Sequence, residues 1–343
     1  MAASSMTPEL FPLIEQHLET FFDKMVRKGF GFSVDMSRYQ LSTGGKRLRA
    51  SIPGWVYAAC GADPVEAIPL SCALELIHNA TLVHDDLQDG DTVRRGKPTV
   101  WKRWSSAQAI NCGDALFQFA TAMVCEMKLE GLVLTKILRC LSEGSLQVIE
   151  GQAQEFLMKE EGYPAWARYL GVVRGKTAAL IAASVTTALI ALDASGEVIR
   201  ASEDASMEAG VLFQLQDDLL DLYGEKGRER RGSDIAEGKV SALIALLNDR
   251  ASLGDREAVN EILRKPRDLT TDADISDVMG LLDHYGIREI ALAEIASIQT
   301  RLDGHELARI DPSMHRMILE MSSIFMSPIV PEGEPVEWKT IVI

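Results

Sequence analysis

The sequence predicts an all-α protein that folds as a single large helical bundle. Hydrophobic residues make up 47% of the 343 residues and aromatic residues only 6%, and strand-like alternation of apolar and polar residues is scarce. Several apolar segments exceed 20 residues and are apolar around much of their circumference, so neighbouring helices must bury them. We therefore expect one domain over residues 1–343, although length alone would allow about two.

The expected helices are bounded by turns that contain glycine and proline. Gly44-Gly45 precedes the second helix, Gly61-Ala62-Asp63-Pro64 the third, and Glu161-Gly162-Tyr163-Pro164 the sixth. Ala and Leu, which are strong helix formers, are abundant between the turns. In chain order the helices are placed at 8–28, 46–60, 65–89, 105–128, 132–159, 165–193, 197–223, 237–250, 274–300 and 304–326.

Two segments do not have a helical pattern. Residues 224–234 contain three glycines, four basic residues and no apolar anchor, which predicts a mobile, solvated loop. Residues 328–343 contain three prolines and are expected to form an extended C-terminal tail.

Charge and cysteine usage exclude several classes of protein. The 50 acidic and 35 basic side chains give a net charge of −15, which repels phosphate backbones, so no nucleic-acid partner is expected. The five scattered cysteines contain no CxxC pair, which argues against a disulfide framework or a thiolate zinc site. The N-terminus lacks a signal-peptide pattern, and the most apolar run, 178–192, is too short to span a bilayer. We expect a cytoplasmic protein with no stable membrane insertion.

Two aspartate clusters of the form DDxxD lie 132 positions apart. They are Asp85, Asp86 and Asp89, and Asp217, Asp218 and Asp221. On a helix, the first and last carboxylates of each cluster share one face and repel each other by a few tenths of a kcal/mol. Such a cluster at the end of an apolar helix favours a bound cation, and oxygen-only ligands favour Mg²⁺, which also binds substrate phosphates. A single cluster is more often a helix end that faces water, but two of them favour the metal interpretation.

Basic residues accompany both clusters. Lys46 and Arg49 follow Gly44-Gly45, while Arg94 and Arg95 follow the first cluster. Lys176-Thr177 begins the apolar run, and Lys239 follows the glycine- and arginine-rich segment. Each alone is typical of a solvated surface, but together they indicate a site for phosphate oxygens, to which arginine binds in a bidentate manner and lysine as a point charge.

The order of these motifs resembles the trans-isoprenyl diphosphate synthases of the polyprenyl synthetase family. The resemblance is carried by 44–49 (GGKRLR), 75–99 (ELIHNATLVHDDLQDGDTVRRGKPT), Gly113-Asp114, Lys176-Thr177 and 213–239 (FQLQDDLLDLYGEKGRERRGSDIAEGK). It implies an isoprenoid synthase type I fold, which is an all-α bundle with a deep central cavity. It also implies a Mg²⁺-dependent, head-to-tail trans condensation of isopentenyl diphosphate with an allylic diphosphate, catalysed by a homodimer.

The resemblance also implies roles for individual residues. The diphosphate of isopentenyl diphosphate is expected at Lys46, Arg49, His78 and Arg95, and the allylic diphosphate at Arg94, Lys176, Thr177, Gln214 and Lys239. The magnesium ligands are expected to be Asp85, Asp89, Asp217 and Asp221, and the catalytic set Asp85, Asp86, Asp89, Lys176, Asp217 and Asp218. Gln152 and Glu155 occupy positions where the family often has Gln and Asp near the metal, although a solvated helix face explains them as well. His84 is expected to be a packed histidine.

The chemistry implied is ionisation of the allylic C–O bond as charge collects on the leaving diphosphate. A carbocation in a dry cavity is then attacked by the double bond of isopentenyl diphosphate. In the family, bulky aromatics four and five positions before the first aspartate stop growth at fifteen carbons. Here those positions hold Thr81 and Ala80, so we expect a cavity that is open past this level and a product of twenty carbons or more, with geranylgeranyl diphosphate favoured. Candidates for the cavity floor are Ile77, Leu74, Phe117 and Met123.

Two alternatives remain open at this point. A class I terpene cyclase shares the bundle, but it needs no isopentenyl site of the kind formed by Lys46, Arg49, His78 and Arg95. A non-catalytic regulatory subunit commonly loses an acid cluster, and here both are intact. One departure from the family concerns Glu229, which stands where a lysine is usual; Arg228, Arg230 and Arg231 flank it as possible replacements.

Overall fold

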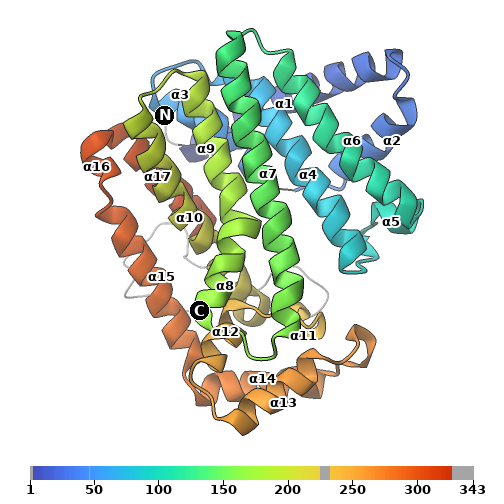
Figure 1. Ribbon diagram of the computed structural model, residues 1–343, viewed down its shortest axis with the longest axis vertical. Coiled ribbons are helices and arrows are strands. Elements are labelled where there is room, and N and C mark those ends of the chain that lie inside the picture. Colours follow the sequence, from blue (N-terminus) through green and yellow to red (C-terminus); the bar gives the residue numbers. More distant parts are fainter. Residues whose placement is uncertain (1–2, 46, 225–231, 327–343) are drawn as a thin grey trace. The chain divides into compact units, whose positions relative to one another are not determined.

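The computed structural model describes residues 3–45, 47–224 and 232–326, with side chains from residue 9 onward. Within this part of the chain 81% of the residues are helical, which confirms the predicted all-α class (Figure 1). Lys46, Glu229 and its neighbouring arginines, and the 328–343 tail lie outside the described residues.

The chain divides into two compact units. The first contains the described residues between 3 and 146, 180–204 and 306–317, and the second contains 147–179, the described residues between 205 and 305, and 318–326. The division falls inside long helices rather than in linkers. The single domain stays a prediction.

The first unit is built around α4 (Ile68–Gln88), which packs against α3 (Leu48–Ala59) and α6 (Ser106–Cys125). The 3₁₀ turn Pro64–Ala67 leads into α4, and the Asp63 carboxylate caps that turn by accepting from Val65 N at 3.0 Å. From Ile68 to Ile77 nearly every α4 side chain is buried, which explains its all-round apolar sequence. The unit also holds α1 (Ala3–Arg27), α2 (Gly31–Ser42), α5 (Val100–Arg103), α16 (Leu307–Ile310) and most of α9 (Ala179–Ala191).

The second unit surrounds α12 (Ala242–Asn248), which is buried along its whole length. Helices α8 (Trp166–Val173), α14 (Asp272–His284) and α15 (Ile287–Asp303) pack against it. Its remaining elements are the π-helical turn Arg174–Ala178, α11 (Ser233–Ala236), α13 (Leu253–Leu263) and the 3₁₀ turn Arg267–Leu269. Besides α9, three helices contribute to both units: α7 (Gly131–Glu160), α10 (Gly196–Tyr223) and α17 (Pro312–Met326).

Several element predictions were wrong for identifiable reasons. Helix α2 was missed because its buried face includes Ser37 and Gln40, which hide the apolar periodicity. The helix expected at 237–250 begins only at Ala242, because Gly238 forms a left-handed turn in which a Cβ would lie 2.3 Å from a carbonyl oxygen. The helix expected at 274–300 is two helices separated at Gly286, which has a positive φ of 60°.

Three further elements differ from the expectation. Helix α13 was missed because its exposed surface is highly charged, although Ser252 caps it by accepting from Asp255 N. A two-stranded hairpin, Val93–Arg94 (β1) with Lys97–Pro98 (β2), follows α4. The helix expected at 165–193 is interrupted by the π-helical turn.

The long apolar stretch Trp166–Ala191 has the length and composition of a membrane span, and within the described residues it is the one helix that does. Of its most apolar window, 78% is buried inside the structure, as in the core helix of a folded domain. This agrees with the buried helix predicted for 178–192.

Candidate active site

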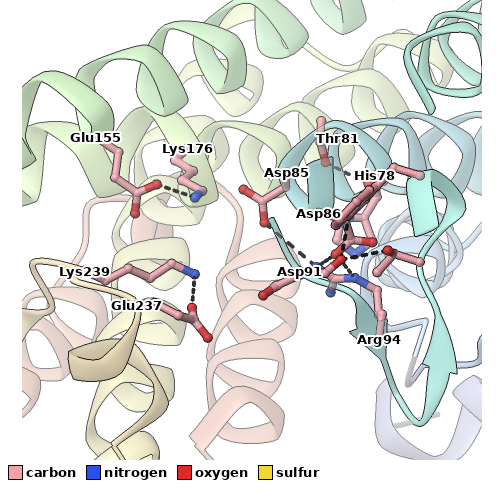
Figure 2. A network of polar contacts seen from close by, with 12 residues as sticks. His78, Thr81, Asp85, Asp86, Asp91, Arg94, Glu155, Lys176, Glu237 and Lys239 are labelled. Carbon is pink, nitrogen blue, oxygen red and sulfur yellow. Dashed lines mark hydrogen bonds and ion pairs between the residues drawn. The ribbon is translucent and has the colours of Figure 1, made fainter. Parts of the chain in front are cut away.

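The first aspartate cluster ends α4 and is tied to the hairpin that follows it. Asp86 is only 1% exposed; its Oδ1 accepts a hydrogen bond from Arg94 Nε at 2.7 Å and forms an ion pair with Arg94 Nη2 at 2.6 Å (Figure 2). Asp85 Oδ2 lies 3.9 Å from the same Nη2. Burial raises the pKa of Asp86 to about 6, although the arginine opposes the shift. Arg94 therefore bridges two acids of the cluster.

The hairpin turn places Arg95 in an unusual backbone conformation. Arg95 and Gly96 form the two-residue loop between β1 and β2, and both have positive φ, 52° and 76°. Such loops favour Asn or Gly at the first position, so an arginine here is held by its surroundings. Helix α2 supplies part of that support, because Tyr39 OH donates to the Pro98 carbonyl and Lys97 Nζ donates to the Ser42 carbonyl, both at 2.6 Å.

Gly45 lets the Arg95 guanidinium approach the backbone of the glycine turn. A Cβ on Gly45 would lie 2.4 Å from Arg95 Nη1, and its φ of 136° also disfavours a side chain. Two residues on, Arg47 has a left-handed φ of 45° and its Nη1 lies 3.3 Å from buried Glu75 Oε1. The same Glu75 oxygen accepts from Asn79 Nδ2 at 2.9 Å. Arg47 is thus tied to α4 by a buried ion pair.

Arg49 and His78 also lie together, with Arg49 Nη1 3.3 Å from His78 Nε2. Burial lowers the pKa of His78 well below its ordinary value, and Arg49, Arg94 and Arg95 lower it further. His78 is therefore neutral, and the positive charge at this end of α4 comes from arginines. Such a group of fixed cations suits an anion with several oxygens.

In the second unit, Asp218 is enclosed by three hydrogen-bond donors. Its Oδ1 accepts from Gln214 Nε2 at 2.8 Å, and its Oδ2 accepts from Tyr169 OH at 2.6 Å and Ala242 N at 2.7 Å. Burial raises the pKa of Asp218, whereas these donors lower it. Burial and the Asp218 charge raise the pKa of Tyr169 well above 10, so the phenol keeps its proton.

Asp221, also buried, binds the segment that follows the glycine- and arginine-rich stretch. Its Oδ1 accepts from Ser233 Oγ at 2.6 Å and its Oδ2 from Asp234 N at 3.1 Å. Asp217 is half-buried on the same helix. Two of the three acids in this cluster therefore also organise the protein around them.

The π-helical turn carries Lys176 and Thr177 between two close glycine contacts. A Cβ on Gly151 would lie 2.2 Å from Lys176 N, and a Cβ on Gly210 would lie 2.5 Å from Ala178 Cα. Helices α7 and α10 thus approach the turn backbone to backbone. A π turn inserts one residue into a helix and is often found at functional sites.

Two side chains of the π turn have an ion-pair or hydrogen-bond partner in the structure. Lys176 Nζ lies 2.6 Å from Glu155 Oε2, and Thr177 Oγ1 donates to Gln214 Oε1 at 2.8 Å (Figure 2 shows the lysine pair). Lys239 Nζ lies 2.8 Å from Glu237 Oε2 in a second pair of the same kind. Glu155 is therefore not a solvated residue, since it is the counter-ion of a predicted substrate ligand.

Comparison with known proteins decides the family. A family model described as polyprenyl synthetase matches residues 33–282. The chain belongs to the polyprenyl synthetase family. It is an isoprenyl diphosphate synthase, and hence a prenyltransferase of isoprenoid biosynthesis.

Two curated relatives and one solved structure illustrate the relationship. The synthase is 36% identical over 233 residues to a short chain isoprenyl diphosphate synthase of Methanocaldococcus jannaschii, covering 67% of this chain and 69% of that one. It is 32% identical over 292 residues to the Methanothermobacter thermautotrophicus enzyme of the same name, covering 84% and 88%. A crystal structure of geranylgeranyl pyrophosphate synthetase from Pyrococcus horikoshii is 30% identical, with a TM-score of 0.83 and coverage of 95% and 98%.

The first aspartate cluster of the synthase offers an oxygen atom to a metal ion. Asp86 Oδ2 is buried and has no hydrogen-bond partner among the described residues, which leaves a carboxylate oxygen available to a cation. Within the same part of the chain, no three His, Cys, Asp or Glu side chains gather into a ready-made cage. A hard ion that keeps water molecules and binds substrate oxygens fits such a partial ligand set.

Sequence reasoning missed several residues that hold the site of the synthase together. Tyr169 had no local signal, since its partner Asp218 lies 49 positions away. Glu237 stands two positions before Lys239 in the same motif, but nothing in that spacing marks it as the counter-ion of the lysine. Glu75 stood inside a quoted motif, and a carboxylate on an otherwise apolar helix was the available signal. His84 is packed as expected, because a Cβ on Gly113 of α6 would lie 2.1 Å from its Nε2.

Proposed function

We propose that this synthase is a Mg²⁺-dependent trans-prenyltransferase that condenses isopentenyl diphosphate with an allylic diphosphate and releases geranylgeranyl diphosphate as its main product. The enzyme class follows from family membership. We propose in addition which metal the synthase uses, which residues bind the substrates, and how long the product is.

We infer that isopentenyl diphosphate binds at Lys46, Arg49, His78 and Arg95. Support comes from the close contact of Arg49 with His78 and of Arg95 with Gly45. The neutral His78 donates a hydrogen bond without adding charge, and the arginines neutralise the diphosphate. The strained Arg95 backbone fits a side chain that is held ready for a ligand.

The allylic diphosphate is assigned to Lys176, Lys239 and Arg94, together with Thr177 and Gln214. Each of the three cations has a carboxylate partner within 3 Å, namely Glu155, Glu237 and Asp86. These partners hold the long side chains in place before substrate arrives, which lowers the entropy lost on binding. The oxygens of the substrate diphosphate then bind these cations alongside the carboxylates or in their place.

The metal ligands in this proposal are Asp85, Asp89, Asp217 and Asp221. The family uses a divalent ion, and the oxygen-only donors favour magnesium. When bound, magnesium supplies Lewis-acid stabilisation of the charge that collects on the leaving diphosphate. The lysines and arginines add to that stabilisation as the allylic C–O bond breaks. The double bond of isopentenyl diphosphate then forms the new C–C bond, and the released diphosphate accepts the proton that leaves.

The observation that carries the product length is the small size of two side chains just before Asp85. Ala80 is fully buried, and Thr81 is half-buried with its hydroxyl donating to the His78 carbonyl. Neither offers the bulk that would stop a growing chain at this level. Further along the same unit, Leu74, Ile77 and Met123 are buried candidates for the floor. Other relatives are named geranylgeranyl, farnesyl and geranylfarnesyl diphosphate synthases, so the choice of length rests on these side chains.

The test compares the products of the wild type with those of Ala80→Phe. With labelled isopentenyl diphosphate and dimethylallyl diphosphate, the wild type should yield twenty-carbon alcohol after dephosphorylation, and Ala80→Phe should yield fifteen carbons or fewer. Ala293→Phe, on an exposed position of α15, controls for the added ring. An unchanged length in Ala80→Phe would show that the wall lies elsewhere. Removal of magnesium with a chelator should abolish both products.

We also infer a homodimer from family membership. Sedimentation velocity at micromolar concentration should give a species of twice the 37.6 kDa chain mass. A species at the mass of one chain would contradict this part of the proposal.

A further inference from the structure

A chain of buried and partly buried hydrogen bonds in the second unit begins at a residue that no motif includes. Tyr169 lies on α8, 3% exposed, and its ring stacks on Trp166 with centroids 5.3 Å apart. Its hydroxyl donates to Asp218 Oδ2 at 2.6 Å, a short bond of the charge-assisted kind. Asp218 is itself 4% exposed, so the bond is shielded from water.

Chemistry fixes the direction of every bond in this chain. A carboxylate only accepts, so Gln214 must turn its NH₂ group toward Asp218 Oδ1, 2.8 Å away. The amide oxygen of Gln214 then faces Thr177, whose hydroxyl must donate to it at 2.8 Å. The Thr177 side chain is thereby oriented by Asp218 through Gln214.

The same carboxylate reaches a second part of the unit. Asp218 Oδ2 also accepts from Ala242 N at 2.7 Å, which is the first residue of α12. Ala242 lies three positions after Lys239, so this bond fixes the end of the segment that carries the lysine. One buried carboxylate thus ties together the π turn, α10 and the start of α12.

We propose that Tyr169 is a positioning residue for the allylic diphosphate: by fixing Asp218 it sets the orientation of Gln214 and Thr177 and anchors the Lys239 segment. This rests on the proposed assignment of those residues to the allylic substrate. It also changes the expected role of Asp218. Because Asp218 Oδ2 accepts from both α8 and the start of α12, Asp218 acts by positioning its neighbours, and the metal is assigned to Asp85, Asp89, Asp217 and Asp221.

Tyr169→Phe removes the hydroxyl and keeps the stacked ring. Loss of a hydrogen bond to a charged group corresponds to about a tenfold change, which we expect in the KM for farnesyl diphosphate and in its magnesium-dependent Kd. The KM for isopentenyl diphosphate should stay within about twofold, because none of its assigned ligands belongs to this chain of bonds.

Tyr285→Phe is the matched control. Its hydroxyl also donates to a carboxylate at 2.6 Å, Asp255 Oδ2, and accepts from Ser252 N at 3.0 Å, but no residue of this group is assigned to substrate. Tyr285→Phe should leave both KM values unchanged. Equal changes in the two KM values of Tyr169→Phe, or the same kinetic changes in the control, would overturn the proposal.

A double-mutant cycle with Thr177→Val separates positioning from a merely structural role. If Tyr169 acts through Gln214 and Thr177, the effect of Tyr169→Phe on farnesyl diphosphate binding should fall to about twofold once Thr177 is valine. Full additivity would refute the connection. Because calorimetric binding requires no turnover, these results stand even if the wild type elongates no chain, an outcome that would instead contradict the proposed function.

Discussion

Replacing Gly151 with alanine should impair the π-helical turn, to which we assign the allylic diphosphate, far more than it destabilises the protein. The added Cβ would lie 2.2 Å from Lys176 N, and 2.8 Å from both Gly175 C and Lys176 Cα. All three atoms belong to the backbone, so no side-chain rotation relieves the overlap. Since carbon contacts normally begin near 3.5 Å, the π turn and helix α7 must separate by about 1 Å.

The size of the effect follows from that displacement. A misplacement of about 1 Å in a substrate-positioning group costs on the order of 10²-fold in rate, so kcat/KM for the allylic substrate should fall about a hundredfold. Overpacking costs about 1–3 kcal/mol of stability, partly offset by about 1 kcal/mol from the better helix propensity of alanine. Tm should therefore fall by only a few degrees.

Gly171→Ala provides the control for this experiment. Gly171 lies on α8, five residues before Lys176, and a Cβ there meets nothing within 4 Å. This variant should keep wild-type kinetics and equal or exceed the wild-type Tm, because alanine favours the helix. Steady-state kinetics and thermal unfolding of both variants provide the measurement. Wild-type kinetics in Gly151→Ala would refute the argument that backbone contact holds the turn.

Three further predictions follow from ion pairs, close contacts and burial. Glu155→Gln should strengthen metal-free binding of inorganic pyrophosphate several-fold, as measured by calorimetry, because Lys176 loses its counter-ion. The control Glu150→Gln, at an exposed position of the same helix, should leave this affinity unchanged. Weaker binding in Glu155→Gln would contradict the pairing. Gly45→Ala would place a Cβ 2.4 Å from Arg95 Nη1, so it should displace the Arg95 guanidinium and raise the KM for isopentenyl diphosphate about tenfold. The KM for the allylic substrate should stay unchanged. Equal changes in the two KM values would count against the assignment of Arg95. Burial and nearby arginines lower the pKa of His78 in the folded state, so the stability that His78 contributes is present above pH 6.5 and lost as the pH falls below it. Between pH 8 and 5, the Tm of His78→Gln should therefore fall less steeply than the Tm of the wild type. Identical slopes of Tm against pH would refute this.

Features that depend on local sequence could be predicted, and features that depend on distant packing could not. Helices α4 and α10 were placed to within a few residues because each has apolar residues along its whole length. Helix α2 could not be recognised, since it is stabilised by packing and its buried face includes polar Gln40. The π turn could not be predicted either, because its surroundings include the close approach of Gly151 and Gly210 from two other helices.

The site shows the same division. The DDxxD spacing singles out six aspartates as candidates, but nothing in the spacing distinguishes Asp218, which three donors enclose, from Asp217 beside it. The partners that make the difference, Tyr169 and Ala242, are brought to Asp218 by the packing of α8 and α12. Counter-ions such as Glu237 were likewise undetectable, because a charged residue near a lysine in sequence is ordinarily solvated.

The most direct test of the central claim is a product analysis of the purified wild-type protein. The protein and magnesium are incubated with labelled isopentenyl diphosphate and, separately, with dimethylallyl, geranyl or farnesyl diphosphate, and the dephosphorylated alcohols are chromatographed. The account predicts elongation from each primer, with geranylgeraniol as the longest abundant product. Release of diphosphate and a hydrocarbon without elongation, or no reaction with any primer, would contradict it.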